Sequence, residues 1–139
     1  MRVTKYHDIS AGHRVIGQKG KCERSYHGHN YRFYFTIEAT TDKDIGMALD
    51  FNKIGILSDW VEQNWDHKTI LWNQDPNIDF FKKVTPDGIW IGDFNPTAEN
   101  MITYLLDVVG PDLLKKYGDA KLVKVKIEET RKCSAEDER

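Results

Sequence analysis

Several features that would define a class of protein are scarce or missing in this sequence. Only two of its 139 residues are cysteines, Cys22 and Cys133, which is too few for a disulfide framework and favours a reducing compartment. No apolar run approaches the roughly 20 residues that span a bilayer, and the opening MRVTKYHDIS lacks the apolar core of a signal peptide. With 20 basic against 22 acidic residues, the chain also lacks the basic field of a nucleic-acid-binding protein. We therefore expect a cytoplasmic protein with neither a membrane nor a nucleic acid as partner.

The chain has enough apolar sequence for one folded domain. Hydrophobic residues make up 40% of it and aromatic residues 12%, as in globular proteins. A chain of 139 residues most simply forms one domain, here residues 1–139, and no repeat, linker or low-complexity segment divides it.

Alternation of apolar and polar residues predicts three strands. The clearest runs from Tyr31 to Ala39, where every second residue is apolar, so that one face of the strand is buried. A first strand is predicted over Arg2–Ala11, and a later one over Val123–Ile127, where lysines separate the apolar residues. The polar tail, 131–139, is expected to fray.

Two helices are predicted between these strands. Asp50 is a suitable N-cap for a helix of about Phe51–Trp65, which has apolar residues at helical spacing. Thr97 caps a second helix, whose apolar stripe reaches Val109 and is expected to break at Gly110-Pro111. Strands and helices in this order predict an α+β fold.

Residues 73–95 are harder to interpret. Aromatic and β-branched residues flank the turn signal Pro86-Asp87-Gly88, which makes a small hairpin possible. No functional role follows from this segment.

Three histidines form a candidate metal site. His27 and His29 stand in an H-x-H pattern just before Tyr31 and share the parity of the buried face. His13 follows the first predicted strand, and antiparallel pairing of the two strands would bring it near the other two. Three neutral imidazoles are the ligand set of an open catalytic zinc site. The plainer alternative is a set of surface histidines at the entrance to a strand.

Other side chains with reactive chemistry are scattered along the chain. The loop before the H-x-H pattern is too long for a tight turn and carries Cys22. The first helix runs into a charged tripeptide, Asp66-His67-Lys68. Glu129 is predicted to lie on the same buried face of the strand as Ile127, whereas Glu128 is predicted to lie on the face exposed to solvent. A carboxylate on an inner face needs a partner, so Glu129 is the candidate ligand-binding residue.

With these pieces in place, the chain resembles the family of 6-pyruvoyl-tetrahydropterin synthases and 6-carboxy-tetrahydropterin synthases. The similar segments lie in the family's order over nearly the whole chain: AGHR (11–14), GKC (20–22), HGHNY (27–31), GMALDF (46–51), DHKTIL (66–71), PTAEN (96–100) and VKIEET (125–130). The resemblance implies a tunnelling fold, with a four-stranded antiparallel sheet backed by two helices. It also implies a homohexamer of two stacked trimers, in which each trimer closes a β-barrel and the active sites lie between subunits.

The resemblance also implies a role for each candidate residue. By this resemblance, His13, His27 and His29 bind zinc, and Cys22 is the catalytic thiol. Asp66 and His67 form a proton relay that reaches the site from a neighbouring subunit, and Glu129 binds the pterin ring. Lys21 and Arg24 lie beside the thiol in the sequence and fit two roles. Either they stabilise the thiolate and attract the triphosphate of the substrate, or they are solvated loop residues.

The implied activity is that of a zinc-dependent lyase acting on 7,8-dihydroneopterin triphosphate. The expected product is 6-carboxy-5,6,7,8-tetrahydropterin, with release of acetaldehyde and triphosphate, on the route to queuosine and other 7-deazaguanines. The compact chain and Asp50 in GMALDF favour this carboxy branch. The alternative is a 6-pyruvoyl-tetrahydropterin synthase acting on the same substrate.

Two further interpretations lie outside this family. A cupin-type dioxygenase also uses H-x-H, but it would need a glutamate where this chain has Phe33 and Tyr34. A non-catalytic, zinc-stabilised pterin-binding module would leave Cys22 and His67 idle, and structural zinc sites usually have four ligands rich in cysteine.

Overall fold

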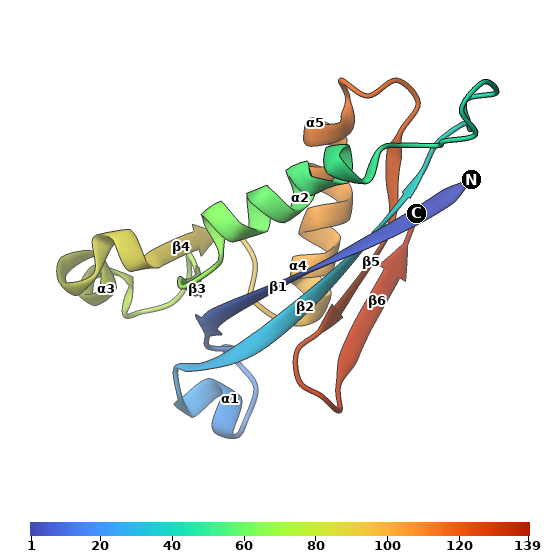
Figure 1. Cartoon of the computed structure of the whole chain (residues 1–139). Coiled ribbons are helices and arrows are strands. Elements are labelled where there is room, and N and C mark those ends of the chain that lie inside the picture. The colour runs from blue at the N-terminus through green and yellow to red at the C-terminus, as the bar shows by residue number, and fades with distance from the viewer.

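One mixed six-stranded sheet, with helices packed against one of its faces, forms the core of the molecule (Figure 1). The computed structural model describes residues 1–139 apart from the side chain of Cys22. The strands are β1 (Arg2–His13), β2 (His27–Glu38), β3 (Thr69–Trp72), β4 (Ile89–Gly92), β5 (Lys121–Glu128) and β6 (Ser134–Glu138), in the spatial order β4-β3-β1-β2-β5-β6. The helices are α1 (Lys21–Arg24), α2 (Phe51–Asn64), α3 (Ile78–Val84), α4 (Ala98–Tyr104) and α5 (Gly110–Leu114), with a 3-10 turn η1 (Pro86–Gly88) and a π-helical turn η2 (Leu105–Val109). The predicted α+β class is confirmed, although the sheet has six strands rather than four.

The two longest strands, β1 and β2, form an antiparallel pair. Their register is unbroken from Arg2 opposite Glu38 to His13 opposite His27. The alternating sequence explains this pairing, because Tyr31 and the apolar residues at every second position after it are buried on one face. Strand β1 ends two residues later than predicted and β2 begins four residues earlier, so the strand pair includes the histidines.

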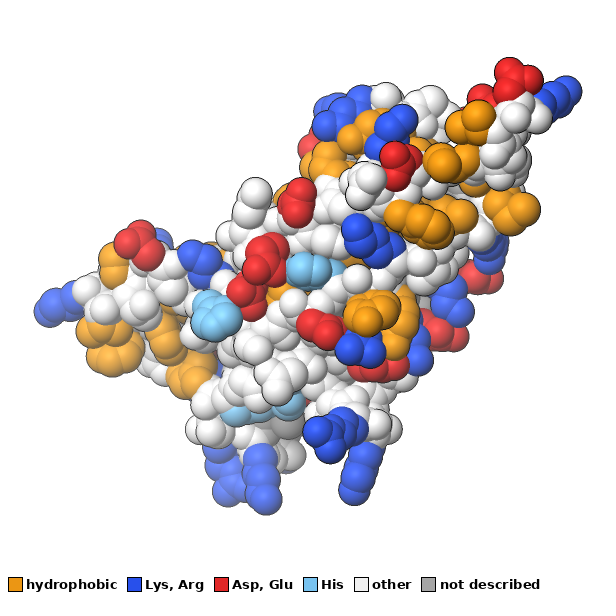
Figure 2. All heavy atoms as spheres, in the orientation of Figure 1, with side chains coloured by type: hydrophobic (Ala, Val, Ile, Leu, Met, Phe, Trp, Pro, Cys, Tyr) orange, Lys and Arg blue, Asp and Glu red, His pale blue; other side chains and the backbone are white. Residues whose placement is uncertain are grey.

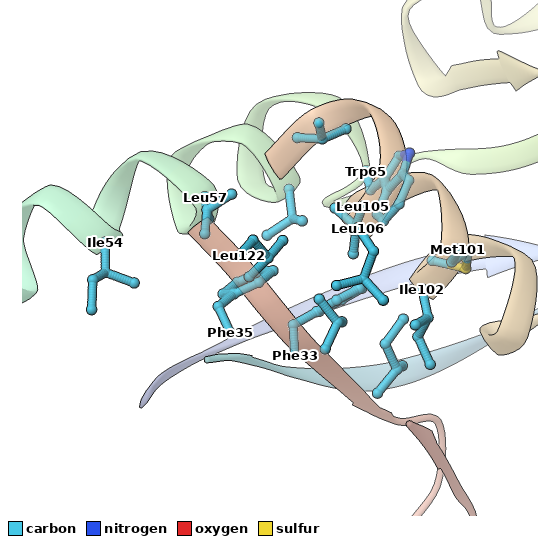
Figure 3. Close-up of a cluster of buried hydrophobic side chains, with 14 of the residues drawn as sticks. Phe33, Phe35, Ile54, Leu57, Trp65, Met101, Ile102, Leu105, Leu106 and Leu122 are labelled. Atoms are coloured by element: carbon cyan, nitrogen blue, oxygen red, sulfur yellow. The ribbon is translucent and has the colours of Figure 1, made fainter. Parts of the chain in front are cut away.

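Helices α2 and α4 cover the buried face of the sheet (Figure 3). The side chain of Asp50 accepts a hydrogen bond from the backbone N–H of Asn52 at 2.8 Å, which confirms the predicted cap of α2. Leu57 of α2 belongs to the same buried cluster as Phe33 and Phe35 of β2, and Trp65 is fully buried directly after the helix. Burial of each such side chain stabilises the fold by about 1.5–3 kcal/mol. In the described chain, no helix has the length and apolar content needed to cross a bilayer.

The helical path continues through Gly110-Pro111, so the predicted break is wrong. Turn η2 leads directly from α4 into α5, and Pro111 lies in the first turn of α5. The proline, which has no N–H to donate, falls where the helix is already widened, because the backbone N–H of Gly110 donates to the carbonyl of Leu105, five residues back. Glycine is needed before it, since a Cβ at Gly110 would lie 2.7 Å from Cδ2 of Leu122 on β5.

The possible hairpin in residues 73–95 is also wrong, because β3 and β4 are parallel. Ile70 pairs with Trp90, and β3 in turn pairs in parallel with the end of β1. Parallel neighbours need a crossover connection, and helix α3 with turn η1 supplies it. The aromatic residues before Pro86 therefore belong to a helix rather than to a strand.

The C-terminal tail is ordered as strand β6, so the prediction that it frays is wrong. Residues Ser134–Glu138 pair antiparallel with β5, and Arg139 forms an ion pair with Asp107 at 2.8 Å. Backbone hydrogen bonds to the free edge of β5 hold this strand, and these bonds do not require apolar side chains. Cys133, just before β6, is exposed and forms no disulfide.

Candidate metal centre and its surroundings

The pairing of β1 with β2 brings the three predicted histidines together. His13 lies directly opposite His27, and His29 lies two residues further along the same face of β2. The two Nε2 atoms of His13 and His27 are 3.1 Å apart, and one nitrogen of each of the three side chains lies within 4.8 Å of the others. The three imidazoles therefore form one cluster at the end of the inner face of the sheet.

Backbone carbonyls orient two of the three rings. His13 donates from Nδ1 to the carbonyl oxygen of Pro96 at 2.7 Å, and His27 donates from Nδ1 to that of Ser25 at 2.8 Å. With the proton on Nδ1, each neutral ring directs the lone pair of Nε2 into the cluster. Burial lowers the pKa of both His13 and His29, which keeps these rings neutral near pH 7.

The cluster fits a zinc ion. Two nitrogen lone pairs that face each other at 3.1 Å repel unless a cation lies between them, and tetrahedral zinc with ligands at about 2.0–2.1 Å separates its nitrogens by roughly 3.3 Å. In addition, Nε2 of His29 is buried and has no hydrogen-bond partner among the described residues. A buried polar atom of this kind needs a ligand, and a metal ion satisfies all three rings at once.

Glu129 borders this cluster. Its Oε1 atom lies 3.2 Å from Nε2 of His29, at an angle that does not form a hydrogen bond. The side chain is 27% exposed, so it can still reach a ligand. Glu128 instead accepts a hydrogen bond from Tyr34 and pairs with Lys126. The structure thus separates the two glutamates as their parity predicts.

Asp66 and His67 lie in the turn that follows α2, along the edge of β1. Nδ1 of His67 donates to Asp66 at 2.8 Å, while the other carboxylate oxygen of Asp66 accepts from the backbone N–H of Ser10 at 2.9 Å. Partial burial raises the pKa of Asp66, but the hydrogen bonds from Ser10 and His67 outweigh it and leave this pKa below its ordinary value. Asp66 is therefore ionised near pH 7 and fixes the tautomer of His67.

The environment of His67 differs from that of the triad. Its backbone has a φ of 55°, in the left-handed region, and its side chain is 82% exposed. It lines an open pocket together with Ser10 and Asn30, whose side chains are exposed, and with His29 of the triad. Among the described residues, no hydrogen bond or ring contact joins His67 to the three histidines. The remaining predicted residue, Cys22, lies in α1, and its side chain is outside the part of the chain that the structure describes.

Residues 95 and 96 support the site in a way that was not predicted. Besides the contact of Pro96 with His13, the side-chain amide of Asn95 makes two hydrogen bonds with the backbone of Ile16, at 2.7 and 3.0 Å. The sequence NPT indicated only a helix start. The one sequence feature that could have indicated this role is that Asn95 precedes the helix although Thr97, not Asn95, is its N-cap.

Fold and site together define the class of this protein, an α+β protein with a three-histidine cluster that could hold a metal ion at the end of a strand pair. The family model described as 6-pyruvoyl tetrahydropterin synthase matches residues 2–139, so the chain belongs to that family. A curated relative from Rickettsia typhi, named 6-carboxy-5,6,7,8-tetrahydropterin synthase, is 34% identical over 138 residues, which cover 98% of this chain and 99% of the relative.

Solved structures are similar over the whole chain. A protein from Wolinella succinogenes superimposes with a TM-score of 0.83 at 20% identity, covering 100% of this chain and 98% of that one. The 6-pyruvoyl tetrahydropterin synthase of Caenorhabditis elegans superimposes with a TM-score of 0.68 at 26% identity, covering 100% and 95%. The expected tunnelling fold is thereby confirmed.

Proposed function

We propose that this protein is a zinc-dependent 6-carboxy-5,6,7,8-tetrahydropterin synthase. It would convert 7,8-dihydroneopterin triphosphate into 6-carboxy-tetrahydropterin, release acetaldehyde and triphosphate, and so supply the synthesis of queuosine and related 7-deazaguanines. The observation that carries the proposal is the cluster of His13, His27 and His29, with two lone pairs facing each other and one buried nitrogen that forms no hydrogen bond. The name of the Rickettsia typhi relative supports the carboxy branch.

The three histidines would hold the zinc ion through one nitrogen each. Three protein ligands leave a coordination position free for the substrate. Zinc bound there would supply Lewis-acid polarisation of the hydroxyl groups on the side chain of the substrate. Pro96 and Ser25 keep the rings of His13 and His27 in the required tautomer.

Glu129 would hold the pterin ring. A carboxylate can accept two parallel hydrogen bonds from the amino-pyrimidine edge of a pterin. Because Glu129 borders His29, a ring held by this carboxylate would extend its side chain toward the metal centre.

Cys22 and His67 would move the protons. We assign the thiolate of Cys22 as the base and His67 as the complementary acid. Asp66 would keep one proton on Nδ1 of His67, so that the proton given to the substrate leaves from Nε2. The exposure of His67 supports a role in the site of a neighbouring copy, within a hexamer of two stacked trimers. We place this assembly in the cytoplasm.

The triphosphate would bind beside α1. Lys21 and Arg24 line an open pocket together with Ser25 and His27. Figure 2 shows Lys and Arg side chains at this end of the molecule, next to histidine side chains. Two cations beside the metal centre suit a polyanionic leaving group.

A second candidate keeps the substrate and the site but stops at 6-pyruvoyl-tetrahydropterin. The description of the family and the similarity to the Caenorhabditis elegans enzyme favour it. A non-catalytic pterin-binding module is a more distant candidate.

Product analysis separates these candidates. Zinc-loaded protein is incubated with dihydroneopterin triphosphate, and the pterin and acetaldehyde are identified by mass spectrometry, with Cys22→Ala run in parallel. We expect a 6-carboxy product and acetaldehyde, both lost in the variant. A 6-pyruvoyl product would favour the second candidate, and ligand binding without turnover would favour the module.

A further inference from the structure

The most deeply buried carboxylate described outside the metal centre is that of Asp75. Its side chain is 1% exposed and lies in the turn between β3 and α3, within the segment that had no predicted role. Oδ1 accepts hydrogen bonds from Arg14 at 3.0 Å, from the hydroxyl of Tyr26 at 2.8 Å and from the backbone N–H of Asn77 at 2.9 Å. A buried charge persists only with partners of this kind.

Both side-chain partners of Asp75 are neighbours of metal-site histidines in the sequence. Arg14 follows His13 at the end of β1, and Tyr26 precedes His27 at the start of β2. The guanidinium carbon of Arg14 also lies 4.5 Å from the centre of the Tyr26 ring. Asp75 therefore joins the two ends of the segment 14–26, which contains α1.

The hydroxyl of Tyr26 is held by two hydrogen bonds, one donated and one accepted. It donates to Asp75 and accepts from the side-chain amide of Asn77 at 3.0 Å. Burial raises the pKa of Tyr26, which keeps the hydroxyl protonated as a donor at any pH near neutrality. The ring of Tyr26 packs edge-on against Phe81 of α3, with 4.8 Å between the ring centres. The crossover between β3 and β4 thus provides a rigid support for this end of the loop.

The beginning of the loop has a second attachment. Asn95 pairs with both the N–H and the carbonyl of Ile16, as described above. Beyond that point the contacts that the structure describes are local, such as those of Gly17 with Glu23 and of Arg24 with Gly20. The position of α1 therefore depends on how its flanking residues are held.

We propose that Asp75 is a positioning residue that holds both ends of the 14–26 loop, and with them α1, against the metal centre. This inference rests on the proposed function, in which α1 carries the reactive thiol and two phosphate-binding cations. The described hydrogen bonds of the Asp75 side chain are to Arg14, Tyr26 and Asn77, and none of them is to a histidine of the triad. Its effect on the reaction is exerted through Arg14 and Tyr26.

The test compares Asp75→Asn with Asp79→Asn, a matched change on the exposed first turn of α3. Tyr26→Phe is a second, milder variant, since it keeps the ring beneath Arg14 and removes only the hydroxyl. Each zinc-loaded protein is studied by hydrogen exchange of backbone amides, and kcat and KM are measured with dihydroneopterin triphosphate. A double variant, Asp75→Asn with Tyr26→Phe, shows whether the two residues act as one unit.

We expect faster exchange confined to residues 14–26, and a fall in kcat of about tenfold or more, the scale of a lost hydrogen bond to a charged group. KM should rise as well, because α1 also carries the two phosphate-binding cations, while Asp79→Asn should match the wild type and the double variant should lose no more than Asp75→Asn alone. Exchange equal to that of the control, or faster exchange throughout the core, would overturn the proposal. If the wild type has no turnover on this substrate, the proposed function fails, but the exchange pattern still decides whether Asp75 positions the loop.

Discussion

The histidine triad and the Asp66–His67 pair differ in how completely one chain builds them. His13 is 2% exposed and its ring is held by a backbone carbonyl, whereas the side chain of His67 is 82% exposed and its one described hydrogen bond is to the carboxylate of the preceding residue. The triad comes from two paired strands, whose register fixes the distances between rings. The pair comes from a turn at the edge of the sheet, beside an open pocket. Strand pairing can thus preorganise a metal centre, while a residue on an exposed turn is suited to act on a surface supplied by another molecule.

The largest expected effect is that of removing one member of the triad. In His13→Ala, we expect the zinc content to fall from about one ion per chain toward zero, with activity reduced more than about 100-fold, because two imidazoles make a poor site. Metal analysis after gel filtration, together with an activity assay, tests this. The matched control is His7→Ala on the same strand, since His7 pairs with Glu62 rather than with the triad. Retention of zinc in His13→Ala would contradict the assignment.

Removing His67 should affect the reaction but not the metal. In His67→Asn, we expect kcat to fall by about 10²- to 10⁴-fold, the usual contribution of a general acid, with an unchanged zinc content. Asparagine is chosen because it tolerates the left-handed backbone at this position. Steady-state kinetics combined with metal analysis checks this outcome. A loss of zinc in His67→Asn would show that the triad and the pair are not separate units.

A smaller effect should appear in the pH dependence of stability. The pKa of Asp66 is lowered in the folded state, so its ionised form stabilises the fold above the ordinary pKa of 3.8, and this contribution is lost as the pH falls through the lower folded value. We expect Asp66→Asn to be about 1 kcal/mol less stable than the wild type at pH 7, and the difference to shrink below pH 3.8. Urea unfolding between pH 7 and pH 3 measures this difference. A difference that stays constant with pH would mean that the charge of Asp66 does not contribute.

Much of the histidine cluster could be predicted because alternation along a strand encodes burial. The parity of His27 and His29 with Tyr31 placed both rings on the inner face, and the same rule separated Glu129 from Glu128. The caps of α2 and α4 followed from Asp50 and Thr97, whose side chains accept the expected backbone hydrogen bonds.

The elements that could not be predicted are those whose structure depends on distant backbone. Strand β6 has the sequence SAEDE, which carries no apolar pattern, and it forms because the edge of β5 offers hydrogen-bonding groups. The parallel pairing of β3 with β4 depends on a crossover that short apolar runs do not reveal. In the same way, nothing near Asp75 in the sequence distinguishes it from exposed Asp79, because its partners lie 49 and 61 residues away.

Subunit complementation tests the difference between the triad and the pair most directly. Each single variant, His13→Ala or His67→Asn, is expected to have little activity. The two variants are co-expressed with different affinity tags, and mixed assemblies are purified by using both tags in turn. If the triad of one copy works with the pair of another, mixed assemblies should regain about a quarter of the wild-type activity, since half of the copies at each of the two positions are intact. Mixed assemblies that remain as inactive as the separate variants would contradict a site shared between copies and would place His67 within the site of its own chain.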